Sequence, residues 1–217
     1  MNLKKYLPLI LLGVGLLILV GAFFFVKNSR NNSSVDEEET VKEIPVEERP
    51  IVSLVPSADG HYLKLSIAQI KVKKAASLDY ELLYTLPDGR TQGVPGTVKL
   101  AGAADIIKDL LLGSESSGKF RYDEGVDGGT ITLRFRDEKG KLLGKLSTKF
   151  AMQSDTTSLS MPDGEFKYEL DKIAKGVFFV TMQTFAEPNP SSVVVYQNGY
   201  AAFSSDGKPH SGKVVTQ

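Results

Sequence analysis

One uninterrupted apolar run, LPLILLGVGLLILVGAFFFV, covers residues 7–26 and contains no charged side chain. At about 1.5 Å of rise per helical residue, about 20 residues cross the roughly 30 Å hydrocarbon core of a bilayer. Backbone groups in lipid have no water to bond, so such a segment must be helical. We therefore expect a transmembrane helix over Leu7–Val26, preceded by a short cytoplasmic N-terminus over residues 1–6. This helix is the membrane contact that the sequence predicts.

The same region shares some features with a cleaved secretory signal. Lys4 and Lys5 precede the apolar run, and the small residues of Val20–Ala22 would suit a signal peptidase. The run nevertheless continues through Phe23–Val26, whereas a cleaved signal usually has a shorter apolar core. An uncleaved anchor is therefore the favoured interpretation, and a cleaved signal is the alternative. An anchor of this kind would hold the long polar remainder on the outer side of the cell membrane.

The composition narrows the class of protein. The chain has no cysteine and no tryptophan, and its formal net charge is +0. An exported domain without cysteine has no disulfide bonds and no lipoprotein anchor, so its core must hold it together alone. The balanced charge gives no basic footprint for nucleic acid. These features suit a bacterial envelope protein better than an animal immunoglobulin domain, which usually has a core tryptophan.

Residues 27–50 are predicted to form an acidic, flexible linker. The segment begins with a polar stretch, and its apolar residues do not recur at the spacing of a helix or a strand. The acidic side chains of this segment are Asp36, Glu37, Glu38, Glu39, Glu43, Glu47 and Glu48. Low hydrophobicity and like charge keep such a chain extended and solvated. A solvated stalk is favoured, and a docking segment for a basic partner is the alternative.

From Ile51 onward, apolar residues alternate with polar ones, which is the pattern of strands with one buried face. Gly93–Gly96 is expected to be irregular, and Ala103–Leu112 fits either a helical turn or a strand. The strands predicted in this part are Ile51–Val55, His61–Lys71, Leu78–Leu86, Thr97–Leu100, Thr130–Arg136 and Leu142–Met152. Short strands at this spacing, separated by glycine-rich turns, are typical of an antiparallel sandwich.

A polar stretch, residues 154–160, is the candidate boundary to a second β region. Gly176–Phe185 is expected to be a central strand because it is apolar on both faces. Asn198 and Gly199 lie between two apolar runs and predict a tight hairpin. The other strands expected here are Glu165–Leu170, Val193–Tyr196, Tyr200–Phe203 and an edge strand at Val214–Val215.

The predicted fold is therefore mainly β. It combines the N-terminal transmembrane helix with an immunoglobulin-like antiparallel β-sandwich ectodomain over residues 51–153. A smaller C-terminal β region, residues 154–217, is expected to pack on this sandwich or to extend it, because about 60 residues without disulfides are marginal alone.

Several segments resemble a known group of proteins. They are Leu110–Ser114, Ser116–Gly118, Tyr122–Val126 and Gly176–Phe185. In these segments the chain looks like uncharacterised bacterial single-pass envelope proteins with β-sandwich ectodomains. The resemblance covers residues 51–185 and implies the same architecture and location, but it implies no activity.

Two motifs near residue 116 partly match known signatures. Gly113–Phe120 approaches the phosphate-binding loop, but Phe120 stands where a hydroxyl must reach Mg²⁺, and no helix pattern follows. No nucleotide is therefore expected as a partner. Ser116 and Lys119 match the S-x-x-K of penicillin-binding enzymes, but the companion motifs are absent. A flexible polar loop is the favoured interpretation of this segment.

Metal and cofactor sites are not expected. Asp123, Glu124 and Asp127 form a weak candidate Ca²⁺ site in a glycine-rich turn, but their spacing does not fit an EF-hand loop. His61 and His210 are far apart in the sequence and are too few to hold a metal alone. No catalytic set and no cofactor-binding motif stands out.

Tyrosines are the remaining candidates for a binding surface. Alternating tyrosines on strands are mostly core residues or cross-strand pairs. A carbohydrate platform is the alternative role for Tyr62, Tyr80, Tyr84, Tyr196 and Tyr200.

The function that these features favour is a non-catalytic binding or scaffolding module of the bacterial envelope, whose partner is an unidentified envelope protein or glycan. The alternatives are a surface-fibre or pilus-type subunit that assembles by strand addition or through its apolar N-terminal helix, and a weak serine hydrolase that uses Ser116 and Lys119.

Overall fold

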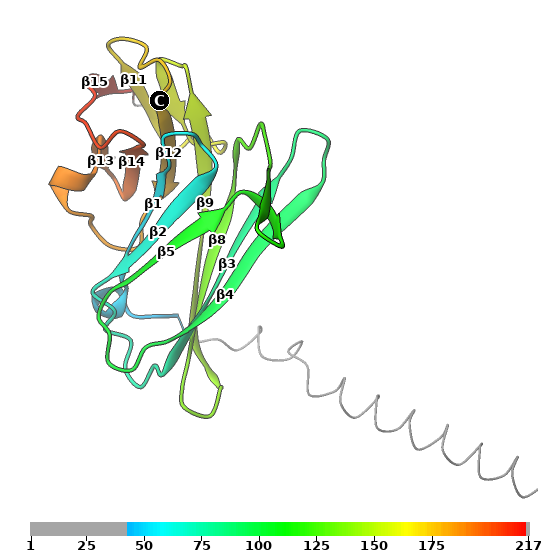
Figure 1. Ribbon diagram of the computed structural model, residues 1–217. Coiled ribbons are helices and arrows are strands. Elements are labelled where there is room, and N and C mark those ends of the chain that lie inside the picture. Colours follow the sequence, from blue (N-terminus) through cyan, green and yellow to red (C-terminus); the bar gives the residue numbers. More distant parts are fainter. Residues whose placement is uncertain (1–42, 216–217) are drawn as a thin grey trace, which may run out of the picture. The chain divides into compact units, whose positions relative to one another are not determined.

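A seven-stranded antiparallel sheet forms the centre of the protein (Figure 1). The structure is a computed structural model, and it describes residues 43–215. In spatial order the strands are β13 (Val195–Gln197), β14 (Tyr200–Ser204), β12 (Phe178–Gln183), β9 (Leu142–Ser154), β8 (Gly128–Arg136), β3 (Ser77–Thr85) and β4 (Thr91–Lys99). The period-two alternation predicted from the sequence gives this sheet two different faces.

A second, three-stranded sheet covers one face of the central sheet (Figure 1). Its strands are β1 (Ile51–Pro56), β2 (Tyr62–Ala68) and β5 (Ile106–Leu111). Every second residue of β1 and β2 points inward, and Leu54, Leu63 and Leu65 are fully buried. They pack in one cluster with inward residues of the central sheet, such as Leu133 and Phe135. The two layers thus bury their apolar faces against each other, as expected for a sandwich.

A smaller sheet lies against the opposite face, over β12 and β14. Its strands are β10 (Ser158–Ser160), β11 (Lys167–Leu170) and β15 (Gly212–Val214). On β12, Val180 packs into the main core, while its neighbour Phe179 packs into a second cluster with Tyr168. This double burial confirms the prediction that the apolar segment around β12 is central, and β12 pairs with both β9 and β14.

Residues 154–215 therefore divide between two positions. Strands β12, β13 and β14 continue the central sheet, whereas β10, β11 and β15 pack on its other face. The described residues are mainly β, with antiparallel sheets in a sandwich-like arrangement. The Asn198-Gly199 hairpin is confirmed, because both residues adopt positive φ at the β13–β14 turn.

The predicted transmembrane span, the N-terminus over residues 1–6 and most of the linker lie outside the described residues. Within residues 43–215, no helix has the length and apolar character needed to cross a bilayer. The expectation of a flexible linker up to residue 50 is wrong for its last part. Ile44 is buried in the main core, and Val46–Glu48 forms a 3₁₀-helix.

This N-terminal segment of the domain is fixed by polar contacts. The Arg49 Nε group donates a hydrogen bond of 3.0 Å to the Ile44 carbonyl, and Arg49 also pairs with Glu43. Glu48 binds Lys73 of the β2–β3 loop, with 3.0 Å between Nζ and Oε1. The contact with Lys73 holds the Glu48 side chain, which the sequence pattern had placed in a solvated linker, and leaves it only 19% exposed.

Two strand assignments also change. Gly93–Gly96, expected to be irregular, lies in the middle of β4, which pairs along its whole length with β3. Gly96 is needed there, because a Cβ would lie 2.2 Å from the Tyr80 ring. The ambiguous segment Ala103–Leu112 contains a strand, β5, and not a helical turn.

The segment expected to be a flexible polar loop is instead a two-stranded ribbon. Its strands are β6 (Gly113–Ser116) and β7 (Lys119–Tyr122). Ser117 and Gly118 connect them with φ values of 53° and 76°, the positive values that a tight hairpin of type I′ requires. The ribbon is almost wholly exposed, so burial imposes no apolar alternation along both of its strands that would have predicted it.

Candidate functional site

Aromatic rings gather where the β6–β7 ribbon meets the start of β2. The His61 and Tyr122 rings are stacked, with centroids 3.9 Å apart and planes 4° apart. Phe120 lies beside Tyr122 at 6.1 Å and 9°, and Tyr62 meets Tyr122 edge-on at 6.2 Å. We call these side chains, His61, Tyr62, Phe120 and Tyr122, the aromatic surface.

The aromatic surface is open to solvent. Phe120 is 52% exposed and Tyr122 is 38% exposed. The other exposed large apolar side chains of residues 43–215 include Val46, Ile107 and Ile173, which are not part of this group. Scattered apolar residues are normal on a surface, but a contiguous group of them marks an interaction site.

Backbone contacts explain how the sequence brings these rings together. Phe120 and Tyr122 are two residues apart on β7 and therefore point to the same face of the ribbon. The Leu112 N–H donates to the His61 carbonyl at 2.8 Å, and the Asp123 N–H donates to the Leu112 carbonyl at 2.9 Å. Both ends of the ribbon are thereby fixed next to the β1–β2 turn.

The β1–β2 turn holds His61 in place through Asp59. The Asp59 carboxylate accepts hydrogen bonds from the Ser57 hydroxyl at 2.5 Å and from the His61 backbone N–H at 3.0 Å. These two bonds, the hydroxyl first, hold the pKa of Asp59 below its usual value. The other carboxylate oxygen lies 3.3 Å from His61 Nδ1.

This arrangement of serine, aspartate and histidine does not form a catalytic triad. The Ser57 hydroxyl donates its hydrogen to Asp59, and the carboxylate stands between the hydroxyl and the imidazole. Activation of a serine requires the imidazole to accept the hydroxyl hydrogen directly. The group is therefore a turn that orients the His61 ring.

A cleft of about 400 Å³ adjoins the aromatic surface. Tyr62 belongs to both, and Lys64 and Asp109 line the cleft as directly opposed residues of β2 and β5. The remaining lining residues are Val55, Pro56, Ser57 and Ser205. Desolvation, a hydrogen bond with Tyr122 and nearby carboxylates raise the pKa of Tyr62, so its hydroxyl keeps its proton.

The aromatic surface and the first described residues lie at opposite ends of β2. His61 and Tyr62 stand at the beginning of β2, whereas Lys73, which binds Glu48, follows its end. A strand of 7 residues spans about 20 Å. In Figure 1 the cyan β1–β2 turn and the blue segment that precedes β1 lie at opposite ends of the sheet formed by β1, β2 and β5.

The structure separates Ser116 and Lys119 from the arrangement that their motif requires. They are directly paired across the β6–β7 hairpin and are both exposed, whereas the motif places them one turn apart on a helix. The phosphate-loop candidate, Gly113–Phe120, is the same hairpin and likewise has no helix after it. Glu115 caps the turn by accepting from the Gly118 N–H at 3.0 Å.

The candidate Ca²⁺ ligands are not gathered around a common point. Asp123 accepts a hydrogen bond from the Tyr84 hydroxyl at 2.9 Å, while Glu124 and Asp127 are exposed. Among residues 43–215, no three His, Asp or Glu side chains converge as metal ligands. The second histidine, His210, contacts Asp206 at 3.0 Å and lies far from the aromatic surface in the sequence.

Of the five tyrosines considered as a platform, Tyr62 alone belongs to the aromatic surface. Tyr84 is buried, and Tyr80 and Tyr196 pack against the main core. Tyr200 stacks on Phe166 at 5.6 Å within the second cluster. Phe120 and Tyr122 were not predicted as binding residues, although they alternate with Arg121 after a Ser-Gly turn.

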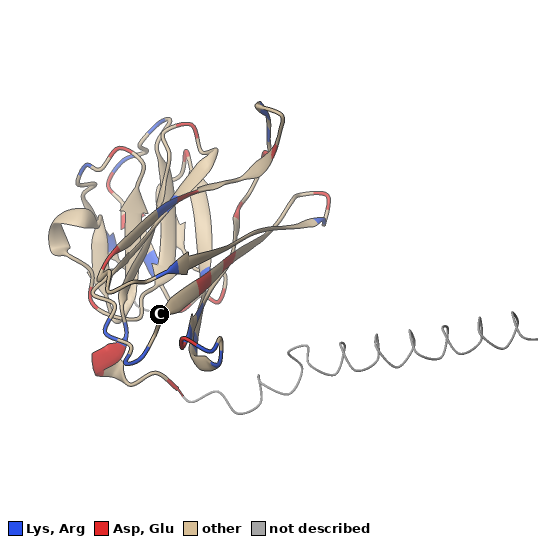
Figure 2. Cartoon of the chain, turned by 60° about the horizontal axis from the view of Figure 1, so that its bottom comes forward, with Lys and Arg blue, Asp and Glu red and all other residues tan. Residues whose placement is uncertain are grey.

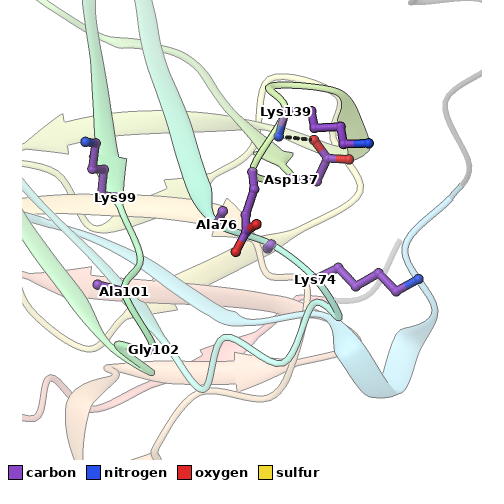
Figure 3. Close-up of a pocket in the computed structure, with 9 residues that line it drawn as sticks. Lys74, Ala76, Lys99, Ala101, Gly102, Asp137 and Lys139 are labelled. Atoms are coloured by element: carbon purple, nitrogen blue, oxygen red, sulfur yellow. Dashed lines mark hydrogen bonds between the residues drawn. The ribbon is translucent and has the colours of Figure 1, made fainter.

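A cavity of about 600 Å³ lies elsewhere, between the loops that follow β2, β4 and β8 (Figure 3). Lys74 and Lys99 line it, but their side chains point in opposite directions (Figure 3). The Asp137 carboxylate accepts a hydrogen bond of 2.9 Å from the Lys139 backbone N–H. This open hollow therefore offers no convergent set of groups for a ligand.

Charged side chains are mixed over the described surface. Figure 2 shows acidic and basic residues interspersed along the loops, with no large field of one sign in this view. Long-range attraction of a highly charged polymer needs such a field. The aromatic surface is therefore the most distinctive feature of the described part of the chain.

No protein-family model, no curated protein and no solved structure matches this chain. The class of this protein is therefore described from the fold and the surface of its described residues. The described residues form an antiparallel β-sandwich that carries an exposed aromatic surface beside a polar cleft.

Proposed function

We propose that this protein is a membrane-anchored, extracytoplasmic binding or scaffolding module of the bacterial envelope. Its ectodomain is an immunoglobulin-like β-sandwich, and its binding site is the aromatic surface. The observation that carries the proposal is the exposure of Phe120 and Tyr122, at 52% and 38%, on a ribbon that is fixed at both ends. Full burial of a fully exposed side chain of this size contributes about 1.5–3 kcal/mol, so each of these half-exposed rings gains roughly half of that when a partner covers it.

The aromatic surface lies at the end of β2 that is remote from the first described residues. The predicted anchor, Leu7–Val26, precedes the domain in the sequence. The first described residues of the domain lie near the C-terminal end of β2, where Glu48 binds Lys73 of the loop that follows this strand. The aromatic surface lies at the other end, about 20 Å away along β2. The aromatic surface is thus separate from the part of the domain that follows the predicted anchor in the sequence.

The ribbon has the rigidity that a binding site needs. Its rings are held by stacking, by backbone hydrogen bonds and by the bond between Tyr84 and Asp123. Side chains that are already ordered lose little conformational entropy when they bind. Aromatic anchors in such pre-formed sites are typical binding hot spots.

Assembly into fibres by strand addition receives less support from the free edges. Pro95 lies in the middle of the outer strand β4 and has no N–H to donate. The outer strand β5 carries Lys108 and Asp109 at its centre, and charged residues protect strand edges against pairing. Ser116 and Lys119 likewise offer a hydrolase no helix on which lysine could activate serine.

The test is photo-crosslinking in intact cells. A photoreactive phenylalanine replaces Phe120 in the full-length protein, and the same group replaces Ile173, which is 49% exposed, as a control. A discrete crosslinked species from position 120 that is absent at position 173, and that disappears with Tyr122→Ala, supports the proposal. Equal labelling from both positions, or none from position 120, contradicts it.

A further inference from the structure

We infer that the aromatic surface and its adjoining cleft bind an uncharged glycan. This inference rests on the proposed binding function and names the chemical class of the ligand. It follows from the way in which ring faces and hydrogen-bonding groups are combined over Tyr62, Tyr122, Lys64 and Asp109.

The rings provide the apolar half of the site. A pyranose ring has C–H bonds on its faces, and these carry partial positive charge that is attracted to the negative face of an aromatic ring. Phe120 and Tyr122 lie nearly parallel, with 9° between their planes, and both are partly exposed, while His61 covers one face of Tyr122. Two such rings 6.1 Å apart can contact neighbouring parts of one saccharide chain.

The cleft provides the polar half. Lys64 and Asp109 face each other across β2 and β5 and are both exposed. In the described part of the chain, neither side chain has a hydrogen bond to another residue. A lysine ammonium only donates and an aspartate carboxylate only accepts, so a sugar diol can satisfy both at once.

The same pair argues for an uncharged ligand. One positive and one negative group lie side by side, so an anion would be attracted by Lys64 and repelled by Asp109, and a cation would meet the reverse. Hydroxyl groups carry no such penalty. A volume of about 400 Å³ also lies toward the lower end of the range for small-ligand clefts.

An extended peptide suits the site less well. Peptides that add to a sheet need an open strand edge, and the β5 edge presents Lys108 and Asp109 at its centre. A helix would need a continuous apolar groove, whereas the cleft beside the rings is lined by Ser57, Lys64 and Asp109. A protein partner is therefore the alternative outcome of the test.

The test uses the full-length protein in a detergent that contains no sugar headgroup. Because the chain has 8 tyrosines and no tryptophan, tyrosine fluorescence reports directly on rings such as Tyr62 and Tyr122. The probes are the neutral oligosaccharides chitohexaose, cellohexaose and mannohexaose, with anionic hexagalacturonate for comparison. Calorimetry confirms each affinity.

We expect at least one neutral probe to bind, and hexagalacturonate to bind at least tenfold more weakly. Tyr122→Ala and Asp109→Ala should each lower the affinity at least tenfold, whereas the control Ile173→Ser should leave it within twofold. A ring-only protein contact would be insensitive to Asp109→Ala, so this variant separates the two ligand classes.

Three results would overturn the inference: no binding of any neutral probe, preference for the anionic probe, or equal affinities in all variants. The proposed function fails separately. If position 120 still crosslinks to a discrete protein in cells while no neutral probe binds, the binding function stands and the glycan assignment is wrong.

Discussion

The Tyr84 hydroxyl donates a hydrogen bond of 2.9 Å to Asp123 Oδ2 and so joins core strand β3 to the residue that follows the β6–β7 ribbon. Tyr84 is 2% exposed. Burial raises its pKa well above the usual range, and the hydrogen bond and charge of Asp123 add to the effect. The phenol is therefore a neutral donor that fixes the base of the ribbon.

Removal of this hydroxyl should weaken the fold. Tyr84→Phe leaves a carboxylate without its donor, and we expect the free energy of unfolding to fall by about 1.5–3 kcal/mol, the range for hydrogen bonds to charged groups. Urea denaturation of both proteins measures the difference. Tyr80→Phe is the matched control, because no hydrogen bond from its hydroxyl occurs within residues 43–215. Equal losses in the two variants would contradict the role given to Asp123.

The raised pKa of Tyr84 also predicts a pH dependence at high pH. A phenol whose pKa is higher in the folded state binds its proton more tightly there than in the unfolded chain. Its contribution is complete below the unfolded pKa of about 10 and is lost as the pH rises above that value. Melting temperatures between pH 8 and pH 11 should therefore fall more steeply for the wild-type protein than for Tyr84→Phe. Parallel curves would refute this.

Asp59 predicts the opposite dependence at low pH. Its pKa is lowered, by the Ser57 hydroxyl first and by the His61 N–H second. Its contribution is therefore present above the usual pKa of about 3.9 and is lost as the pH falls below it. The difference in melting temperature between wild type and Asp59→Ala should shrink from pH 6 to pH 3. A constant difference would show that the turn does not depend on the ionised carboxylate.

Gly129 tests the close packing of β8 against β3. A Cβ at this position would lie 2.0 Å from the Leu83 carbonyl oxygen, and backbone cannot rotate away as a side chain can. We expect Gly129→Ala to cost about 3 kcal/mol or more, at the upper end of overpacking penalties. Gly140 has φ +80° and open space around it, so Gly140→Ala should cost about 1 kcal/mol through backbone strain alone. Chemical denaturation that ranks the two variants in reverse order would rule out the clash.

Phe120 should be dispensable for folding. Its ring is 52% exposed, and surface substitutions usually change the free energy of unfolding by less than about 0.5 kcal/mol. Phe120→Ser should therefore leave the urea midpoint nearly unchanged, while it abolishes the crosslinked species formed from a probe at position 122. A large loss of stability would identify Phe120 as a core residue and remove the basis of the binding site.

The β5 edge should pair with a second copy of the protein when its charged side chains are removed. A second copy that paired with this edge would have to desolvate Lys108 and Asp109 at the centre of the strand, and charged side chains in this position protect a strand edge against pairing. Lys108→Val combined with Asp109→Val should shift the protein to dimers or larger species in analytical ultracentrifugation. The matched control removes the same charges from a turn, with Glu138→Val and Lys139→Val. Identical sedimentation of both double variants would argue against edge protection.

Particular residues show how far sequence reasoning reached. The alternation of apolar and polar residues over Leu78–Leu86 predicted a strand, and the structure has a strand over Ser77–Thr85. The prediction succeeds because a strand with one buried face carries an apolar side chain at every second residue. The β6–β7 ribbon was missed, because a hairpin held by Tyr84, Asp123 and His61 needs no apolar pattern of its own. Asp123 was considered as a calcium ligand, whereas the tertiary structure gives it a phenol as partner.

The amino-acid sequence by itself determined the local preferences of this protein: the apolar run at residues 7–26, the alternating strands and the turns at Asn198-Gly199 and similar sites. These local preferences depend on neighbours within a few residues and on the regular spacing of hydrophobic side chains. Only the tertiary structure decided that β12 lies between two sheets and that His61 stacks on Tyr122. Such contacts join residues about 60 positions apart, and their partners are selected by packing across the whole domain.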